Sequence, residues 1–374
     1  MFDGEYVFEA LLYTFIATIS IQFVYYVLLF SKFAFAKEEQ PSLKNIPVSI
    51  IVCAKNEAGN LAELIPKLLE QDYEQFEIVL INDSSSDDTL EIMESFKSDH
   101  SNIKIVDVKS NEAFWGNKKY ALTLGIKAAA HDFLLFTDAD CVPKSNQWVK
   151  AMSSHFSNEK SIVIGYGAYT KHKGSFLNKL IRFETLFTAM QYFAYSKIRL
   201  PYMAVGRNLA YRKDTFYNVN GFMNHFKIRS GDDDLFVNEA ATAQNTSICF
   251  SEDSFTISQP KTTLNEWINQ KRRHVSTANH YKFKHKFLLT LFYVSQVTFW
   301  LLAIILLIVT FKPIIVTSLI VFRFLFQYLI INYSAKKLDE ADTILLLPLL
   351  ELFLIVSQFS IFMTNLISKP THWK

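Results

Sequence analysis

Residues 132–140 read DFLLFTDAD, an apolar stretch that ends in two carboxylates, and this stretch decides the fold. A continuous apolar run of this length is typical of a strand buried on both faces of a parallel sheet. Asp138 and Asp140 stand at positions i and i+2, so their side chains point the same way from an extended chain. Because ligands of such sheets bind at the carboxyl ends of strands, the two acids mark a candidate site.

The sequence before this stretch alternates apolar runs with helical patterns. We predict strands at residues 48–54, 76–83 and 102–108, and helices at residues 60–71, 87–97 and 117–130. This alternation is typical of an α/β fold with a doubly wound sheet and right-handed crossovers. The polar domain is expected to span residues 45–260.

Apolar residues are concentrated at the two ends of the chain. Residues 7–30 are long enough to span a bilayer, which takes about 20 residues. The start MFDGEY is acidic and no small-residue cleavage site follows, so residues 1–36 are expected to form an uncleaved anchor. Lys32, Lys37 and Lys44 follow this anchor and place the polar domain in the cytoplasm by the positive-inside rule.

Further spans are predicted at residues 288–311, 314–333 and 343–366, within a C-terminal membrane region of residues 288–374. Lys336 and Lys337 then fall in a cytoplasmic turn, whereas Lys369 and Lys374 fall outside, against the rule. We expect transmembrane helices at both ends of an integral protein of a bacterial-type inner membrane.

Two predicted spans carry a charge that is costly inside a bilayer. Arg323 and Glu351 lie at matching depths, counted from their shared turn at about 1.5 Å per residue. We expect an ion pair between them, joined by Gln327. The alternative is that each side chain reaches water separately.

The composition excludes several classes of protein. Lysine plus arginine is 38 and aspartate plus glutamate is 36, a net charge of +2 that argues against a nucleic-acid partner. Cys53, Cys141 and Cys249 stand far apart, so neither a zinc site nor a disulfide framework is expected.

Acidic residues recur where the fold predicts ligands. Asp83 ends a strand in INDSSSDDT, where it can accept hydrogen bonds from a base or ribose, or form a plain turn or N-cap. Asp138 and Asp140 can share one hard cation, Mg²⁺ or Mn²⁺, that bridges diphosphate oxygens.

Residues 231–235 read GDDDL, and the mutual repulsion of three acids favours a cation or general-base role over a solvated loop. Residues 270–274 read QKRRH, within an amphipathic segment expected to lie at the membrane surface over residues 261–287. This segment can bind anionic lipid, or its cations can hold a diphosphate, and both roles are compatible.

The motifs VCAKNE, IND, K-x-x-A-L, DAD, GDDDL and QKRRH occur in an order that resembles the inverting family-two glycosyltransferases of GT-A fold. Relatives in that family include cellulose, chitin and hyaluronan synthases and bacterial exopolysaccharide or glycolipid enzymes. The resemblance covers residues 47–290. It implies that a hexosyl or N-acetylhexosaminyl group is transferred with inversion from a nucleotide-diphosphate donor. The resemblance favours UDP as the nucleotide. The implied acceptor is a glycan or a lipid-linked sugar beside membrane lipid.

The resemblance also assigns roles to single residues. Asp233 matches the catalytic base. The donor side is formed by Ala54, Glu57, Asp83, Lys118, Asp138, Gln270 and Arg273. The metal ligands are Asp140 and Asp138. The acceptor side is formed by Gly206, Arg207, Asn208, Asp232 and His274.

One departure from the family pattern bears on the product. His274 stands where the family's Q-x-x-R-W motif has Trp, a residue that supports the end of a growing polymer, and this puts processive synthesis in doubt. Three alternatives stay open: a nucleotidyltransferase, a processive synthase that secretes its polymer, and an inactive membrane scaffold. A nucleotidyltransferase would usually have a Gly-rich basic loop after the first strand, and this sequence has none there. The intact acidic motifs oppose an inactive scaffold.

Overall fold

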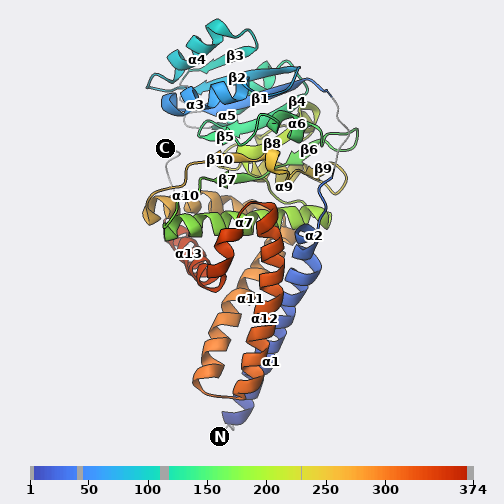
Figure 1. The fold of residues 1–374 in the computed structure, drawn as a ribbon, viewed down its shortest axis with the longest axis vertical. Helices are drawn as coiled ribbons and strands as arrows, with labels where there is room; N and C mark the ends of the chain where they lie inside the picture. The colour runs from blue at the N-terminus through green and yellow to red at the C-terminus, as the bar shows by residue number, and fades with distance from the viewer. Residues whose placement is uncertain (1–3, 40–44, 110–117, 229, 369–374) are drawn as a thin grey trace.

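The computed structural model of the protein describes residues 4–39, 45–109, 118–228 and 230–368. Three layers follow one another along its long axis (Figure 1). A sheet domain lies at one end, the helices α7 (Phe176–Lys197) and α10 (Leu264–Thr277) cross the middle, and long apolar helices extend to the other end.

The main sheet has seven strands in the order β3-β2-β1-β4-β8-β6-β9. The first four are parallel, and β8 pairs antiparallel with β4. The four parallel strands β1 to β4 confirm the four strands predicted from the sequence. Their bounds and those of the others are β1 Val48–Ala54, β2 Phe76–Asp83, β3 Ile103–Val108, β4 Phe133–Asp138, β6 Ile162–Ile164, β8 Leu209–Arg212 and β9 Thr246–Ile248.

Helices cover both faces of the parallel strands, because alternate residues of a strand point to opposite faces. Ile50 of β1 belongs to the core that contains Leu64 of α3, whereas Ile51 belongs to the core that contains Ile126 of α5. The sheet is therefore doubly wound, as predicted. The helices around it are α3 (Ala58–Leu69), α4 (Thr89–Asp99), α5 (Lys118–Ala128), α6 (Trp148–Ser153), α8 (Lys213–Asn218) and α9 (Asp234–Ala240).

A second, three-stranded sheet follows the DAD motif directly. Its order is β5-β10-β7, with β5 at Cys141–Pro143, β10 at Thr256–Ser258 and β7 at Gly167–Tyr169. In Figure 1 this sheet lies between the main sheet and α7. The chain that leaves the candidate metal ligands therefore runs toward the middle layer.

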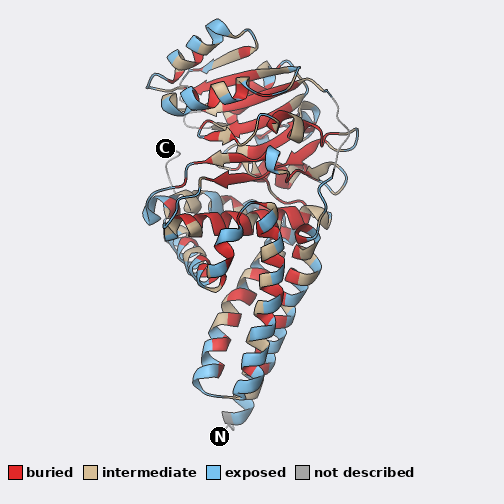
Figure 2. Cartoon of the chain, viewed as in Figure 1, coloured by how far each residue is buried: buried red, intermediate tan, exposed pale blue. Residues whose placement is uncertain are grey.

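The middle layer is built from α7, which the sequence patterns did not predict, and α10, which they did. Figure 2 shows α7 mostly buried, which fits a helix enclosed by the sheet domain and the apolar helices. The predicted surface segment 261–287 is divided: α10 begins with a capping box of Thr263 and Glu266, and a new helix begins at Phe283.

Within the described residues, four helical segments are long and apolar enough to cross a membrane. The first joins α1 (Gly4–Phe23), a π-helical stretch η1 (Val24–Phe30) and α2 (Ser31–Ala34). The others are α11 (Phe283–Ile308), α12 (Pro313–Lys337), and η7 (Ala341–Leu346) continued by α13 (Leu347–Ile367). Much of the outer surface of these helices is exposed in Figure 2, and residues such as Ile308, Ile314 and Leu325 present apolar side chains there.

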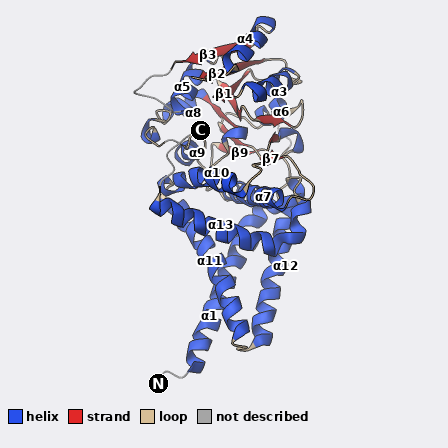
Figure 3. Cartoon of the chain, turned by 90° about the vertical axis from the view of Figure 1, so that its left-hand side faces the viewer, coloured by secondary structure: helices blue, strands red, loops and turns tan. Residues whose placement is uncertain are grey.

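The last segment is placed differently from the other three. Figures 1 and 3 show α1, α11 and α12 extending far from the sheets, whereas α13 stays close to α7 and α10. Near its start, Asp342 accepts a hydrogen bond of 2.9 Å from Arg182 of α7. Near its end, Asn365 accepts one of 3.0 Å from Arg272 of α10. Its length and composition match the predicted span, but both of its ends contact the middle layer.

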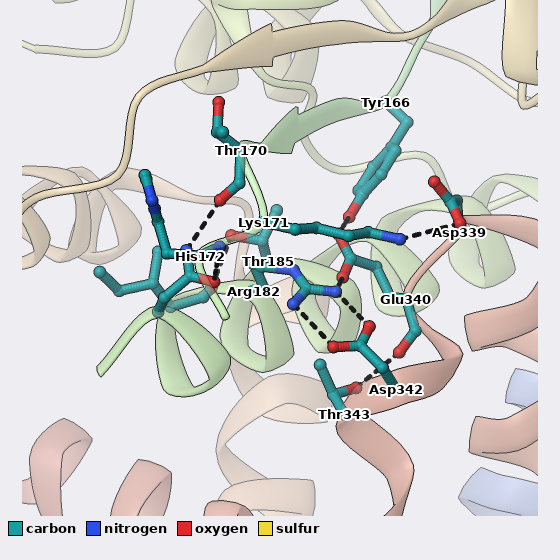
Figure 4. A network of polar contacts seen from close by, with 12 residues as sticks. Tyr166, Thr170, Lys171, His172, Arg182, Thr185, Asp339, Glu340, Asp342 and Thr343 are labelled. Carbon is teal, nitrogen blue, oxygen red and sulfur yellow. Dashed lines mark hydrogen bonds and ion pairs between the residues drawn. The ribbon is translucent and has the colours of Figure 1, made fainter. Parts of the chain in front are cut away.

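A polar network that is buried at Arg182 and Glu340 connects the turn after α12 to the sheet domain (Figure 4). Arg182 forms an ion pair with Glu340, which also accepts a hydrogen bond of 3.3 Å from Tyr166 beside β7. Lys171 binds Asp339 at 2.9 Å. Burial raises the pKa of Glu340 to about 7, against the opposing effect of Arg182. The apolar helices and the sheets are thus joined through ionic contacts as well as through packing.

Candidate active site

The predicted acids come together because they end neighbouring strands. β2, β1 and β4 lie side by side, with Ala54 paired to Asn82 and Cys53 paired to Asp138. Asp83 and Asp138 therefore lie at one edge of the sheet, on either side of the end of β1.

Asp83 has the properties of a ligand-binding carboxylate. It is buried, and within the described residues its Oδ2 atom has no hydrogen-bond partner. Burial raises its pKa, although Lys55 and Lys118 act in the opposite direction. Ala54 is buried beside it, and Glu57 stands just before α3, where its carboxylate accepts a hydrogen bond of 2.5 Å from Asn60. A buried oxygen without a partner suits a donor group of a nucleoside.

Lys118 connects two parts of the sequence that are far apart. Its ammonium lies 2.9 Å from Asp138 and 2.9 Å from Asp232. Burial disfavours the charge, but the two carboxylates outweigh it and raise the pKa of Lys118 well above its ordinary value. The ammonium thus joins the DAD motif to the GDDD motif.

The three adjacent acids each have different partners. Asp232 faces Lys118. Asp233 accepts hydrogen bonds from two backbone amides, of Gly206 at 2.6 Å and of Asp234 at 2.7 Å. Asp234 is buried and accepts from Tyr281 at 2.7 Å and from Thr277 at the end of α10. The motif therefore links the donor side, the 206–208 segment and the middle layer.

Asp233 has the electrostatics expected of a general base. Burial raises its pKa to about 8, and the charges of Asp232 and Asp234 act in the same direction. Its two amide hydrogen bonds fix the orientation of the carboxylate. Each carboxylate oxygen has a second lone pair, so a proton acceptor remains available.

Asp138 and Asp140 fit a hard cation. Ligand atoms of these two residues and of Cys141 lie within 4.8 Å of one another. Although Asp140 keeps solvent-exposed surface, desolvation by the protein around it, followed by the charge of Asp138, raises its pKa. Cys141 is buried, and its thiol lies 2.8 Å from the hydroxyl of Ser258. Two carboxylates without a thiolate are the ligand set that Mg²⁺ and Mn²⁺ prefer.

The 206–208 segment is placed beside Asp233, but its three residues differ in what they can reach. The amide of Gly206 is occupied by Asp233. Arg207 lies over the ring of Tyr169, 4.3 Å from its centroid, and donates to Gly167. Asn208 is fully buried, and its amide bonds only protein groups: Trp148, Tyr166 and Ser254. These hydrogen bonds stabilise the core, and the expected contact of Asn208 with an acceptor stays a prediction.

The basic motif of α10 approaches the same site. Gln270 and Arg273 are half-buried and three residues apart, so they share one face of the helix. His274 keeps solvent-exposed surface. The protein around it, with Lys271, Arg273 and Arg207, lowers the pKa of His274 to about 3. His274 is therefore neutral at physiological pH.

Two sets of contacts around the candidate site were missed from the sequence. Asp234 was grouped with its neighbours, although its hydrogen bonds to Thr277 and Tyr281 fix α10 against the acidic motif. Lys119, directly after Lys118, is completely buried. The only sequence signal for either was an unusual neighbourhood: a third consecutive acid, and a second consecutive lysine at a helix start.

Comparison with known families identifies proteins that this chain resembles. Residues 49–228 match glycosyl transferase family 2. A poly-beta-1,6-N-acetyl-D-glucosamine synthase of Staphylococcus epidermidis is 29% identical over 155 residues, which cover 41% of this chain and 36% of that protein. The synthase of Staphylococcus aureus strain MSSA476 is 26% identical over 170 residues, covering 43% and 40%. The matched segment thus spans well under half of either relative.

A solved structure supports the fold over a longer range. A mannosyltransferase from Pyrobaculum calidifontis, in complex with GDP-Man and Mn²⁺, is similar with a TM-score of 0.60. The similarity covers 88% of this chain and 98% of that one at 17% identity, so it extends beyond the sheet domain. The GT-A-like sheet expected from the sequence is confirmed.

Proposed function

Residues 49–228 form a glycosyl transferase family 2 domain, and from this premise we propose that the chain transfers a sugar from a nucleotide-diphosphate donor to an acceptor at a membrane surface. The observation that carries the proposal is the position of Lys118, between Asp138 of the donor motif and Asp232 of the acidic motif. Donor and acceptor groups would meet at this point.

The donor would lie along the strand ends. Asp83 and Ala54 would contact the nucleoside, with Glu57 at its edge, and Lys118, Gln270 and Arg273 would approach the diphosphate. UDP is the proposed nucleotide on the resemblance of the motifs, supported by the N-acetyl-D-glucosamine polymer named for the staphylococcal relatives. GDP is the competing nucleotide, since the similar mannosyltransferase was solved with GDP-Man.

Asp233 would act as general base. Its carboxylate would take the proton of an acceptor hydroxyl while that oxygen bonds to the anomeric carbon and the bond from this carbon to the diphosphate breaks. The nucleoside diphosphate leaves with the electron pair, and the configuration inverts. Mg²⁺ or Mn²⁺ held by Asp140 and Asp138 would stabilise the charge of the leaving group. Arg273 and Lys118 add positive charge on the same side.

The acceptor would enter from the middle layer. Gly206, Arg207, Asp232 and His274 would line its path, with His274 as a neutral hydrogen-bonding group. Four apolar segments support a membrane location, and we propose the bacterial inner membrane with the sheet domain in the cytoplasm, where nucleotide sugars are made. A glycan or a lipid-linked sugar suits this position.

The function is tested with purified full-length protein in lipid nanodiscs. It is incubated with radiolabelled UDP- and GDP-sugars, membrane lipid extract and Mn²⁺. We expect one donor to label a product, and EDTA to abolish the labelling. Absence of transfer from every donor, with donor binding intact, would favour the inactive scaffold.

A processive synthase is the second candidate, because the staphylococcal relatives are named for a polymer. His274 argues for single additions, since it replaces the Trp that supports a growing chain in the family that this sequence resembles. Product length decides between the two. If the native chain makes single additions and His274→Trp makes longer products, position 274 limits the product length. A ladder of products from the native chain would establish processivity.

A further inference from the structure

The side chain of Lys119 is completely buried at the start of α5, next to Lys118. Its ammonium donates three hydrogen bonds to backbone carbonyls, of His225 at 2.9 Å, Ile228 at 2.9 Å and Ser230 at 2.7 Å. An ammonium carries three protons, so each one has an acceptor. All three acceptors belong to one short stretch of chain, which we call the 225–230 loop and of which the structure describes residues 225–228 and 230.

Neither helix stability nor packing explains a lysine here. A cation near a helix N-terminus opposes the helix dipole. Burying an ammonium is costly unless it is fully hydrogen-bonded, and an apolar side chain would fill the same space without that cost. What Lys119 supplies is specific to the loop: three donors at one point, which no apolar residue provides.

The 225–230 loop leads directly into the acidic motif. Gly231 follows it with a φ of +95°, a left-handed turn that favours glycine, and Asp232 and Asp233 come next. A carbonyl held at Ser230 thus lies two residues before Asp232. Burial lowers the pKa of Lys119 to about 8, while Asp232, Asp234 and Asp233 oppose that shift, so its charge is felt by all three acids.

We propose that Lys119 is a positioning residue that holds the 225–230 loop against α5 and so sets the orientation of Asp232 and Asp233, a role that rests on the function proposed above. The two adjacent lysines contact different parts of the acidic segment. Lys118 binds the side chain of Asp232, and Lys119 binds the backbone that precedes it. Because successive helix residues point about 100° apart, one helix start can serve both purposes.

Lys119→Met tests this role because it keeps the length of the side chain and removes every donor. We expect the transfer rate to fall about 10²-fold, as for misplacement of a reacting group, with the donor Kd unchanged. The rising limb of the pH–rate profile should also move to higher pH, because a cation near Asp233 is lost. Lys119→Arg, which keeps charge and donors, should recover part of the rate and restore the limb.

The decisive measurement is hydrogen exchange of residues 222–231 in full-length protein in nanodiscs. Exchange should rise in Lys119→Met and stay near native in Lys127→Met, the matched change at an exposed lysine of the same helix. Folded Lys119→Met with native exchange and native rate would overturn the proposal. If that variant does not fold, Lys119→Gln is compared in its place with the same two outcomes.

Hydrogen exchange does not depend on activity, so the two proposals fail separately. If exchange of the 225–230 loop rises in Lys119→Met but the native protein transfers no sugar, the proposed function is refuted and the positioning role of Lys119 stands. If the native protein transfers sugar and Lys119→Met changes neither the exchange nor the rate, the positioning role is refuted and the proposed function stands.

Discussion

The guanidinium of Arg323 in α12 donates a 2.9 Å hydrogen bond to the carboxylate of Glu351 in α13, and both side chains are buried among apolar helices. The predicted ion pair is therefore confirmed. Gln327 donates to the same carboxylate at 2.9 Å, Gln22 of α1 accepts from Arg323 at 2.8 Å, and Gln296 of α11 donates to Glu351 at 3.1 Å. One polar cluster thus joins four helices.

Breaking this pair on one side should destabilise the protein strongly. Arg323→Leu and Glu351→Leu should each lower the thermal midpoint in detergent, because removing one partner of a buried pair costs about 3–5 kcal/mol. The double variant should recover part of the loss, since no charge is then left unpaired. Lys336→Leu, at an exposed position of α12, serves as control and should change little. Strictly additive losses would contradict a pairwise interaction.

Two acids should separate donor binding from transfer. Asp140→Ala should abolish Mn²⁺-dependent binding of the nucleotide, because one carboxylate does not anchor a hydrated divalent ion. Asp233→Asn should keep that binding and lower the rate by about 10²–10⁴, the contribution of a general base. Calorimetric titration of UDP with Mn²⁺ measures the first effect and single-turnover assays the second. Equal loss of UDP affinity in both variants is incompatible with Asp233 as base.

The pH dependence of kcat/KM should reflect Asp233. Burial, with Asp232 and Asp234, raises its pKa to about 8, and the base works only when deprotonated, so the rate should rise with pH and level off above this value. Asp232→Asn removes a neighbouring negative charge, which lowers the pKa of Asp233 and moves the rising limb to lower pH. A limb that stays in place or moves upward would exclude Asp233 as the titrating group.

The orientation of the sheet domain can be determined by cysteine labelling in intact cells. Tyr6 is 72% exposed at the start of α1, and Glu94 is exposed on α4. A membrane-impermeant maleimide should label Tyr6→Cys, and should label Glu94→Cys only after permeabilisation. The native cysteines give little background, since Cys141 and Cys249 are buried and Cys53 is half-buried. Labelling of Glu94→Cys in intact cells would place the domain outside.

The sequence was informative where periodicity and chemistry coincide. Strands that end in Asp83 and Asp138 follow from buried apolar runs, and the topology then brings those ends together. Contacts made by a single side chain across long distances carry no such signal. Asp234 bonding Tyr281, or Lys119 bonding the carbonyl of Ile228, depends on backbone geometry that no periodic pattern encodes. Likewise, apolar length predicts that α13 prefers a membrane, but not how it lies there.

The placement of α13 has a consequence for the sidedness of the chain. Asp342 and Asn365, near the two ends of that segment, bind Arg182 and Arg272, and the helices of these arginines are themselves joined through Lys271 and Glu184. We propose that a segment held at both ends by one layer would enter and leave the bilayer on the same face. If the other three apolar helices each cross once, the two ends of the described chain would then lie in different compartments. A reporter joined after residue 368 should on this proposal share its compartment with the sheet domain.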